Sequence, residues 1–135
     1  MSALYEAYET NKDAERNGVW IEEVGGARFQ VSRMGGANSR YQKALAAAMK
    51  PYMREIQLGM VDNDMLEPVM RKVFIDTILI GWEGVKNRLD ETVDFTKANA
   101  EVLFTDLPDL YARLRDSASN YTNFRAVNLK VASGN

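Results

Sequence analysis

Two clusters of carboxylates are the side chains in this sequence whose types could support chemistry. They are Asp62, Asp64 and Glu67, and then Asp90, Glu91 and Asp94. A calcium loop needs oxygen ligands at alternating positions, a central glycine and a terminal glutamate, and neither cluster has that order. The first cluster also stands where a helix is expected to begin, and the positive end of a helix dipole favours acidic side chains there. Both clusters are therefore predicted to be structural or solvated, and no metal site is predicted.

The chain contains neither cysteine nor histidine. This excludes Cys and His nucleophiles, Ser-His-Asp triads, histidine proton shuttles, zinc fingers and disulfides. The pairs Gly25, Gly26 and Gly35, Gly36 have the spacing of neither a Walker phosphate loop nor a dinucleotide fingerprint, so they are predicted to form turns. We expect a protein that is not an enzyme and that uses no cofactor.

Charge is distributed unevenly, although the net charge is only -2 and the pI is near 5.2. That balance gives no general attraction to nucleic acid or to an anionic membrane. Residues 25–54 contain no acidic side chain and six basic ones: Arg28, Arg33, Arg40, Lys43, Lys50 and Arg54. Residues 62–109 contain eleven acidic side chains and five basic ones. Either the two halves of one domain neutralise each other, or the basic segment is a patch for an acidic protein partner.

Methionines are concentrated in the middle of the chain, at Met49, Met53, Met60, Met65 and Met70. Thioether side chains fill irregular cores, and they also form surfaces that adapt to several partners. The sequence leaves both interpretations open. Trp82 has the same two interpretations, as a core residue or as a hot spot of an interface, and the core is favoured.

A β-hairpin is predicted near the N-terminus. Residues 19–24 and 27–34 are strand-like, and Gly25 and Gly26 between them supply the positive φ angles of a tight turn. In the second run apolar and polar residues alternate, which is typical of a strand with one buried face.

The first long helix is predicted to begin at Ser39, which has the capping-box spacing to Gln42. Its apolar stripe comprises Tyr41, Leu45, Ala48, Tyr52 and Ile56. Pro51 lacks the amide that a helix needs, so a kink or break is expected near Lys50. Gly59 ends the element.

A buried central helix is predicted next. It should begin after Asp62 or Asp64 and end at Gly81 and Gly84, with Pro68 still in its first turn. Its last part lies in residues 73–85, the most apolar run of the chain, which is about half as long as a membrane-spanning helix. Its apolar side chains occupy more than one face: Leu66, Met70, Val73, Ile75, Ile78, Leu79 and Trp82.

Two further helices follow a polar surface connection at residues 86–94. Thr96 is expected to cap a helix over residues 97–105, and Pro108 to open one over residues 109–119. Their inward-facing side chains are predicted to be Ala98, Val102, Leu103, Leu110, Leu114 and Ala118. Tyr121 and Phe124 are expected to fold back onto the core.

Together these elements predict a mainly α fold with a small N-terminal β-hairpin (α+β), in which about four to five helices form a compact bundle around the central helix. A single domain is expected over residues 18–125, preceded by an arm at residues 1–17 and followed by a flexible tail at residues 126–135. The N-terminal residues lack the basic and apolar regions of a signal peptide.

Four segments in this order resemble the tail assembly chaperones of long-tailed bacteriophages. They are the hairpin region VWIEEVGGARFQVSRMGGANSRYQKAL, the segment LIGWEGV, the segment DFTKANAEVLFTDLPDLYARL and the closing SASNYTNFR. The resemblance covers residues 18–125. The matching positions are Arg33 and Gly35 in a turn, Gly81 and Trp82 at a helix end, and Phe95, Thr96, Pro108 and Leu110 later. The polar stretch at residues 86–94 is longer than the pattern of the family.

The resemblance implies a non-enzymatic protein of the host cytoplasm that is absent from the mature virion. Such a protein binds the tape measure protein, keeps it soluble and recruits tail tube subunits. A frameshift-extended form of itself and further copies are also implied partners, whereas nucleic acid and membranes are not. The candidate partner-binding residues are Arg33, Met49, Met53, Trp82, Val85 and Phe95. The alternative is a structural component of the tail or of the head-tail connector.

Overall fold

The computed structural model describes residues 2–133 of the chain. Its helices are α1 (Ala3–Tyr8), α2 (Lys12–Asn17), α3 (Ser39–Met49), α4 (Met53–Gln57), α5 (Asn63–Thr77), α6 (Lys97–Asp106), α7 (Pro108–Ser119) and α8 (Ala126–Ser133). Two 3₁₀ turns lie at Lys50–Tyr52 and Tyr121–Phe124. The strands are β1 (Val19–Val24), β2 (Ala27–Val31) and β3 (Leu79–Glu83). The predicted fold class, mainly helical α+β, is confirmed.

The sheet is antiparallel and has the order β1-β2-β3. The predicted hairpin forms β1 and β2, and its turn residues Gly25 and Gly26 have φ angles of +58° and +83°. Arg28 lies on the half-exposed face, where its guanidinium is 3.9 Å from the centroid of the Trp20 ring and pairs with Glu83 at 2.8 Å. The opposite face carries the buried residues of β2 into the core.

The third strand corrects the prediction for the end of the central helix. We expected residues 79–82 to be helical, but α5 ends at Thr77 and Trp82 lies in β3, opposite Phe29. Ser32 explains the stop, because its hydroxyl donates to the Thr77 carbonyl at 2.9 Å and its amide donates to the Ile78 carbonyl at 2.9 Å. These bonds take the carbonyls that a continuing helix would use. Gly81 and Trp82 are therefore strand residues and not a helix end.

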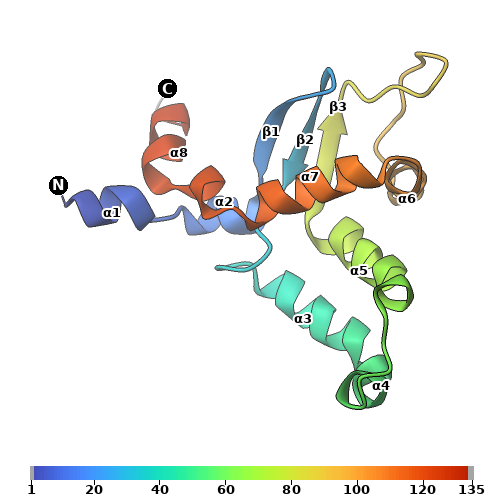
Figure 1. The fold of residues 1–135 in the computed structure, drawn as a ribbon. Coiled ribbons are helices and arrows are strands. Elements are labelled where there is room, and N and C mark those ends of the chain that lie inside the picture. Colours follow the sequence, from blue (N-terminus) through green and yellow to red (C-terminus); the bar gives the residue numbers. More distant parts are fainter. Residues whose placement is uncertain (1, 134–135) are drawn as a thin grey trace.

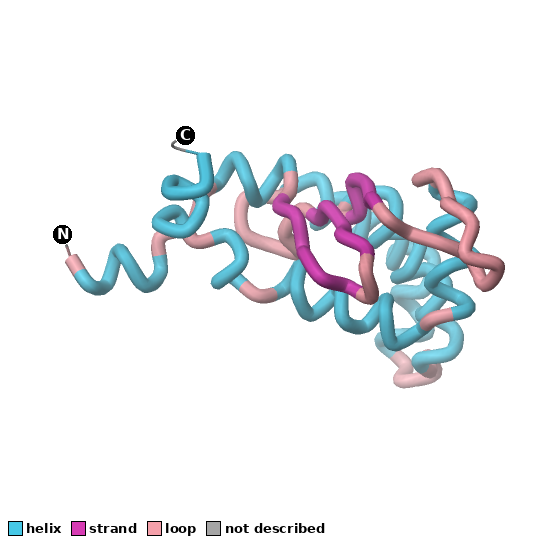
Figure 2. The backbone as a smooth tube through the Cα atoms, turned by 90° about the horizontal axis from the view of Figure 1, so that it is seen from above, coloured by secondary structure: helices cyan, strands magenta, loops and turns pink. Residues whose placement is uncertain are grey.

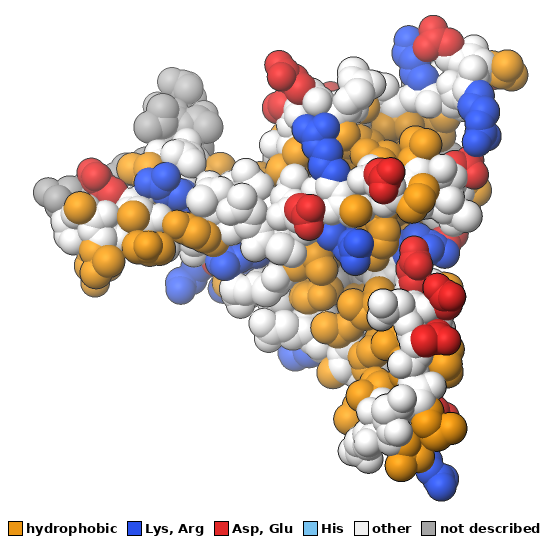
Figure 3. Space-filling model, in the orientation of Figure 1, with side chains coloured by type: hydrophobic (Ala, Val, Ile, Leu, Met, Phe, Trp, Pro, Cys, Tyr) orange, Lys and Arg blue, Asp and Glu red, His pale blue; other side chains and the backbone are white. Residues whose placement is uncertain are grey.

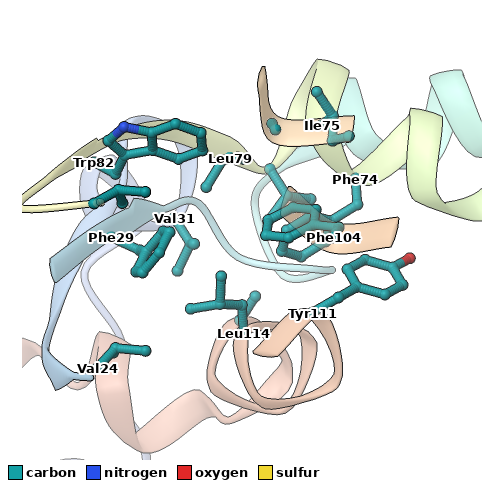
Figure 4. Close-up of a cluster of buried hydrophobic side chains, with 14 of the residues drawn as sticks. Val24, Phe29, Val31, Phe74, Ile75, Leu79, Trp82, Phe104, Tyr111 and Leu114 are labelled. Carbon is teal, nitrogen blue, oxygen red and sulfur yellow. The ribbon is translucent and has the colours of Figure 1, made fainter. Parts of the chain in front are cut away.

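Aromatic side chains hold the core together (Figure 4). Phe74 of α5 contacts Phe104 and Tyr111 edge to face, with ring centroids 5.9 and 5.3 Å apart. Phe29 and Val31 point from the sheet toward Leu114 of α7. Edge-to-face ring pairs fix the relative orientation of the elements that carry them. The sheet, α5, α6 and α7 therefore share one core.

The predicted caps are partly confirmed. Asp62 caps α5 by accepting from the Met65 amide at 2.9 Å, and Thr96 caps α6 by accepting from the Asn99 amide at 3.0 Å. The capping box at Ser39 is wrong, because Ser39 is already inside α3 and the residue before it, Asn38, makes no capping bond. Asn38 is buried, and its amide instead donates to Ser32 Oγ and to the Arg33 carbonyl.

The predictions for two prolines, Pro51 and Pro68, had different outcomes. The break predicted near Lys50 is confirmed, since α3 ends at Met49 and Pro51 lies in the 3₁₀ turn that follows. Pro68, however, lies inside α5 and not in its first turn, and α5 begins at Asn63. The missing proline amide leaves the Asp64 carbonyl without its intrahelical partner.

The buried stripe of α6 differs from the predicted one. Ala100 and Phe104 are buried and Leu103 is half-buried, whereas Ala98 and Val102 are exposed. The large ring of Phe104 fills the space beside Phe74 and sets which face of α6 turns inward. The stripe predicted for α7 is confirmed, with Leu114 and Ala118 buried and Leu110 packed against the core.

Phe124 folds back and is fully buried, as predicted, whereas Tyr121 is only half-buried and stacks on Tyr8 of α1. Where a flexible tail was expected, residues 126–133 form α8, and residues 134 and 135 lie outside the described part. None of the helices in the described part is both long and apolar enough to cross a membrane.

Two extensions leave the core in different directions (Figures 1 and 2). At one end α1 projects beyond α2. At the other end α3, α4 and the first half of α5 form a helical hairpin with α4 at its far end.

Candidate protein-interaction surfaces

The six predicted partner-binding residues fall into three separate places. Trp82, Val85 and Phe95 come together beside the sheet, Met49 and Met53 lie along the α3–α4 extension, and Arg33 lies near α2.

Trp82 is a core residue with a polar anchor. Its ring lies edge to face against Phe95, with centroids 5.1 Å apart, and its Nε1 donates to the Val93 carbonyl at 2.9 Å. The Val93 amide in turn donates to the carbonyl of the buried Val85 at 2.9 Å. Trp82 thus fastens the connection between β3 and α6 to the sheet. It leaves only 7% of its surface exposed.

Arg33 forms an ion pair with the buried carboxylate of Glu15 in α2. The backbone amide of Arg33 also donates to the Glu15 carbonyl at 2.9 Å, and Thr10 Oγ1 donates to the Glu15 carboxylate at 3.2 Å. Gly36 has a φ of +55° and lies so close that a Cβ there would overlap this carboxylate. The guanidinium of Arg33 therefore anchors α2 to the end of β2.

An exposed apolar surface, here called the tip, covers the far end of the α3–α5 hairpin. Its side chains belong to α4, the turn after it and the first turn of α5: Met53, Ile56, Leu58, Met60 and Met65. Met60 is 69% exposed and Leu58 is 61% exposed. Figure 3 shows these hydrophobic side chains gathered around the end that carries α4. Met49 is half-buried behind the tip.

A second apolar surface, here called the hollow, lies between the β1–β2 turn, the 86–94 connection and helices α6 and α7. It consists of two adjoining cavities of about 610 and 300 Å³ that share Lys86, Leu103 and Leu107. Its apolar lining includes Phe29, Val85, Val102, Leu103, Leu107 and Leu110. In Figure 3 hydrophobic side chains collect between the two protruding loops above α6 and α7.

Backbone geometry shapes the hollow. Gly84 has a φ of +78°, and a Cβ on it would lie 3.0 Å from the Gly26 carbonyl, so the chain after β3 passes close to the hairpin turn only because residue 84 is glycine. Leu107 forms the corner between α6 and α7, and it is 48% exposed. Charged side chains of both signs surround the lining: Lys86, Arg88, Arg113, Asp90, Asp106 and Asp109.

The sequence interpretation missed most of the hollow. Val85 was the only predicted binding residue that lines it, and Val102 was expected to point into the core. Val102, Leu103, Leu107 and Leu110 follow one another at spacings of one, four and three residues. A second apolar stripe across the α6–α7 corner could have been recognised from these spacings.

No group of three or more acidic side chains among residues 2–133 is placed to hold a metal ion. The chemistry that the described surfaces offer is the binding of apolar groups inside a ring of charges.

One family of known proteins matches this chain. A family model described as YdaY prophage protein matches residues 36–135. The chain belongs to this family. Its phage origin is therefore shown, and no curated protein or solved structure matches it. The part matched to the YdaY family contains the tip, β3 and the α6–α7 side of the hollow, and it begins after β1 and β2.

Proposed function

We propose that this YdaY-family prophage protein is a tail assembly chaperone. It binds the tape measure protein in the host cytoplasm, keeps that protein soluble and recruits tail tube subunits. It has no enzymatic role and is absent from the mature virion. The phage family and the ordered resemblance of residues 18–125 to tail assembly chaperones support this proposal.

The observation that carries the proposal is the hollow. A tape measure protein is a long helical chain with exposed apolar faces, and such a chain needs a cover until the tail tube encloses it. Apolar side chains that line a concave surface between helices bind the apolar face of a partner helix. Val102 and Leu107 are 60% and 48% exposed at this surface, although their burial would be favourable.

The mixed charges around the hollow are compatible with weak binding to many different segments of one long partner. Three basic and three acidic side chains surround the lining, so no single sign of charge dominates. A tape measure protein presents many successive segments, and a surface that selects mainly an apolar face accepts many of them. Individually weak contacts then combine along one long partner.

Co-expression with the tape measure protein of the same prophage tests the proposal. The wild-type chain should bring the tape measure protein into the soluble fraction and co-purify with it. Val102→Glu should reduce the recovered complex about tenfold, because a desolvated carboxylate in an apolar contact costs more than 1.4 kcal/mol. Thr105→Glu is the matched control, since Thr105 is exposed on α6 but does not line the hollow. Failure of the wild-type complex to form would refute the chaperone function.

The alternative is a structural component of the tail or of the head-tail connector. The two projecting ends of the molecule favour it, because a subunit of a ring needs different contacts on its two sides (Figure 1). Mass spectrometry of purified virions separates the two functions. A structural component is present in the virion in many copies, whereas a chaperone is missing.

A further inference from the structure

We infer that the outer face of α3 binds an acidic helix of a protein partner. This goes beyond the proposed function, because it concerns a different surface from the hollow and does not require a tape measure protein.

One side of α3 packs against α5, and this packing fixes which side chains of α3 point outward. The inner side consists of its half-buried side chains: Tyr41, Ala44, Leu45, Ala48 and Met49. The outer side, here called the basic face, consists of the exposed side chains between them and of Lys50 at the helix end: Ser39, Arg40, Gln42, Lys43, Ala46, Ala47 and Lys50. The basic face contains no acidic residue and no apolar side chain larger than alanine.

The three cations of the basic face are arranged in a row. Lys43 follows Arg40 by three residues and Lys50 follows Lys43 by seven, so all three lie on one side of the helix. At a rise of about 1.5 Å per residue the row is about 15 Å long. It therefore presents positive charge along the whole length of α3.

Ion pairs between the basic and acidic segments of the chain are nearly absent. If residues 25–54 and 62–109 neutralised each other, several ion pairs should join them. Within the described part of the chain only one does so, between Arg28 and Glu83. Packing of the two segments against each other therefore does not account for the cations of α3.

The cations of the basic face are available to a partner. Lys43 and Lys50 form no ion pair with a described carboxylate. Arg40 donates to the Thr77 carbonyl at 3.1 Å, and this neutral acceptor leaves the charge of Arg40 uncompensated.

Carboxylates of the neighbouring helix α5 are engaged on the side that faces α6. Glu67 lies 4.0 Å from Arg71, which pairs with Glu101 of α6 at 2.7 Å. Asp76 pairs with Lys97 of α6 at 3.3 Å. These contacts direct the acidic side chains away from α3.

The acidic side chains near the tip mark where the basic face ends. Asp64 lies one helical turn before Glu67 on the same side of α5, and Asp62 caps that helix. Glu55 follows Arg54 beyond the break at residue 51, and its Oε2 is buried. The basic face therefore excludes Arg54 and the tip.

The small side chains of the basic face favour a helix as the partner. Ala46 and Ala47 lie between Lys43 and Lys50, so the backbone of a partner can approach α3 closely there. A helix is only about 10 Å wide, and carboxylates three, four and seven residues apart on it lie along one side. Such a row of carboxylates is complementary to Arg40, Lys43 and Lys50. Complementary charges of this kind set orientation and the choice of partner.

Nucleic acid fits the basic face less well. A duplex extends beyond the groove that a helix occupies, and its phosphates would meet the exposed Asp64 and Glu67 of α5. Nucleic-acid-binding domains are strongly basic, whereas this chain has a net charge of -2 and a pI near 5.2. The same balance disfavours an anionic membrane surface.

Fluorescence anisotropy with labelled peptides tests the inference on the purified full chain. The acidic probe consists of EAAEAAA repeats, the neutral probe of QAAQAAA repeats, and the broken probe is the acidic one with a proline at its centre. Wild-type protein should bind the acidic probe about tenfold or more tightly than the neutral probe. The broken probe should bind several-fold more weakly than the acidic one, because proline interrupts the helix. Added salt should weaken all binding of the acidic probe.

Charge reversal on α3 gives the decisive result. Lys43→Glu with Lys50→Glu should weaken binding of the acidic probe about tenfold or more, and this variant should instead bind a basic probe of KAAKAAA repeats. Lys12→Glu with Arg16→Glu on α2 is the matched control and should bind the acidic probe as wild type does. These two side chains are also exposed and form no ion pair with a described carboxylate, and the change in net charge is the same. Val102→Glu in the hollow should leave probe binding unchanged, which separates this inference from the chaperone function.

Four results would overturn the inference. The first is equal affinity of wild-type protein for the acidic probe and for the neutral or the broken one. The second is an equal loss of binding in the α3 and α2 variants, which would mean that only the net charge matters. The third is tighter binding of an oligothymidylate or of phosphatidylserine vesicles than of the acidic probe. The fourth is self-association of the chain that the α3 variant abolishes, which would make a second copy the occupant.

Discussion

The two halves of α5 lie in different surroundings although they belong to one helix. From Val73 onward the helix carries buried side chains, and Phe74 contacts two other aromatic rings. Before Val73 no side chain of α5 is buried, and Met65 is part of the exposed tip. One half therefore fixes the fold and the other presents a surface.

The difference also concerns residue type. Aromatic rings in the core are large and rigid, so they define one arrangement of the sheet and helices. Methionines at the tip have three rotatable bonds and accept several arrangements of a bound group. Stability in such a molecule should be high around Phe74 and low at the tip, because local opening follows the amount of buried apolar contact.

Of the substitutions that compare the two halves of α5, Phe74→Ala is expected to lower the free energy of unfolding most. Phe74 is 1% exposed, so its removal leaves a cavity and should cost about 3–5 kcal/mol of unfolding free energy. Met60→Ala at the tip is the control and should change that free energy by less than about 0.5 kcal/mol. Urea unfolding measures both values. Equal losses in the two variants would show that the tip is packed as tightly as the core.

A smaller effect is expected at the other end of the same helix. Asp62→Ala removes the side chain that accepts from the Met65 amide, and loss of such a cap costs about 1 kcal/mol. Hydrogen exchange should become faster in the first turns of α5 and remain unchanged around Phe74.

Asp64→Ala provides the control for Asp62→Ala. Asp64 lies in the first turn of α5, where it can act on the helix dipole, and its side chain makes no capping bond. Its loss should cost about 0.3–0.5 kcal/mol. Faster exchange at Phe74 in the Asp62 variant would contradict the separation of the two halves.

The smallest change in unfolding free energy is expected from Asp76, which lies on the solvent-facing side of the second half of α5. A hydrogen bond from Lys72 lowers the pKa of Asp76 below its ordinary value, and Lys97 acts in the same direction. A carboxyl with a lowered pKa in the folded state stabilises the fold above its unfolded pKa of about 4, and this contribution is lost as the pH falls through the folded value.

Asp76→Asn should therefore cost roughly 0.5 kcal/mol at neutral pH, because the side chain is partly exposed. The difference between wild type and variant should shrink as the pH falls below about 4. Thermal unfolding at several pH values measures it, with Asp116→Asn as the control, because Asp116 is exposed and forms no ion pair within the described chain. A constant difference down to the most acidic pH would contradict the assigned cause.

Local signals were sufficient for much of the fold. Gly25 and Gly26 predicted the hairpin turn, Thr96 and Pro108 predicted the starts of α6 and α7, and Pro51 predicted the break after α3. The turn, the two helix starts and the break each depend on residues that are close together in the sequence, so they could be predicted from the sequence alone.

β3 could not be predicted in the same way. Its sequence, LIGWE, follows an apolar helix directly, and a short apolar run is compatible with helix or strand. The deciding bonds come from Ser32, which lies 45 positions before Thr77. The tip and the hollow could not be predicted from local sequence either. Whether Met60 or Val102 is exposed depends on which other helices pack beside these residues. Only the methionine cluster gave an advance indication of the tip.

The bridge between Thr10 and Arg125 joins the two terminal segments of the chain. The Asn11 amide donates to the Phe124 carbonyl at 2.8 Å, and the Ala126 amide donates to the Glu9 carbonyl at 2.8 Å. Sequence added at either end would therefore emerge on the side of the molecule that carries α1 and α8, away from the tip (Figure 1). An affinity tag or a fluorescent protein fused there would crowd α1 and leave both α4 and the hollow open.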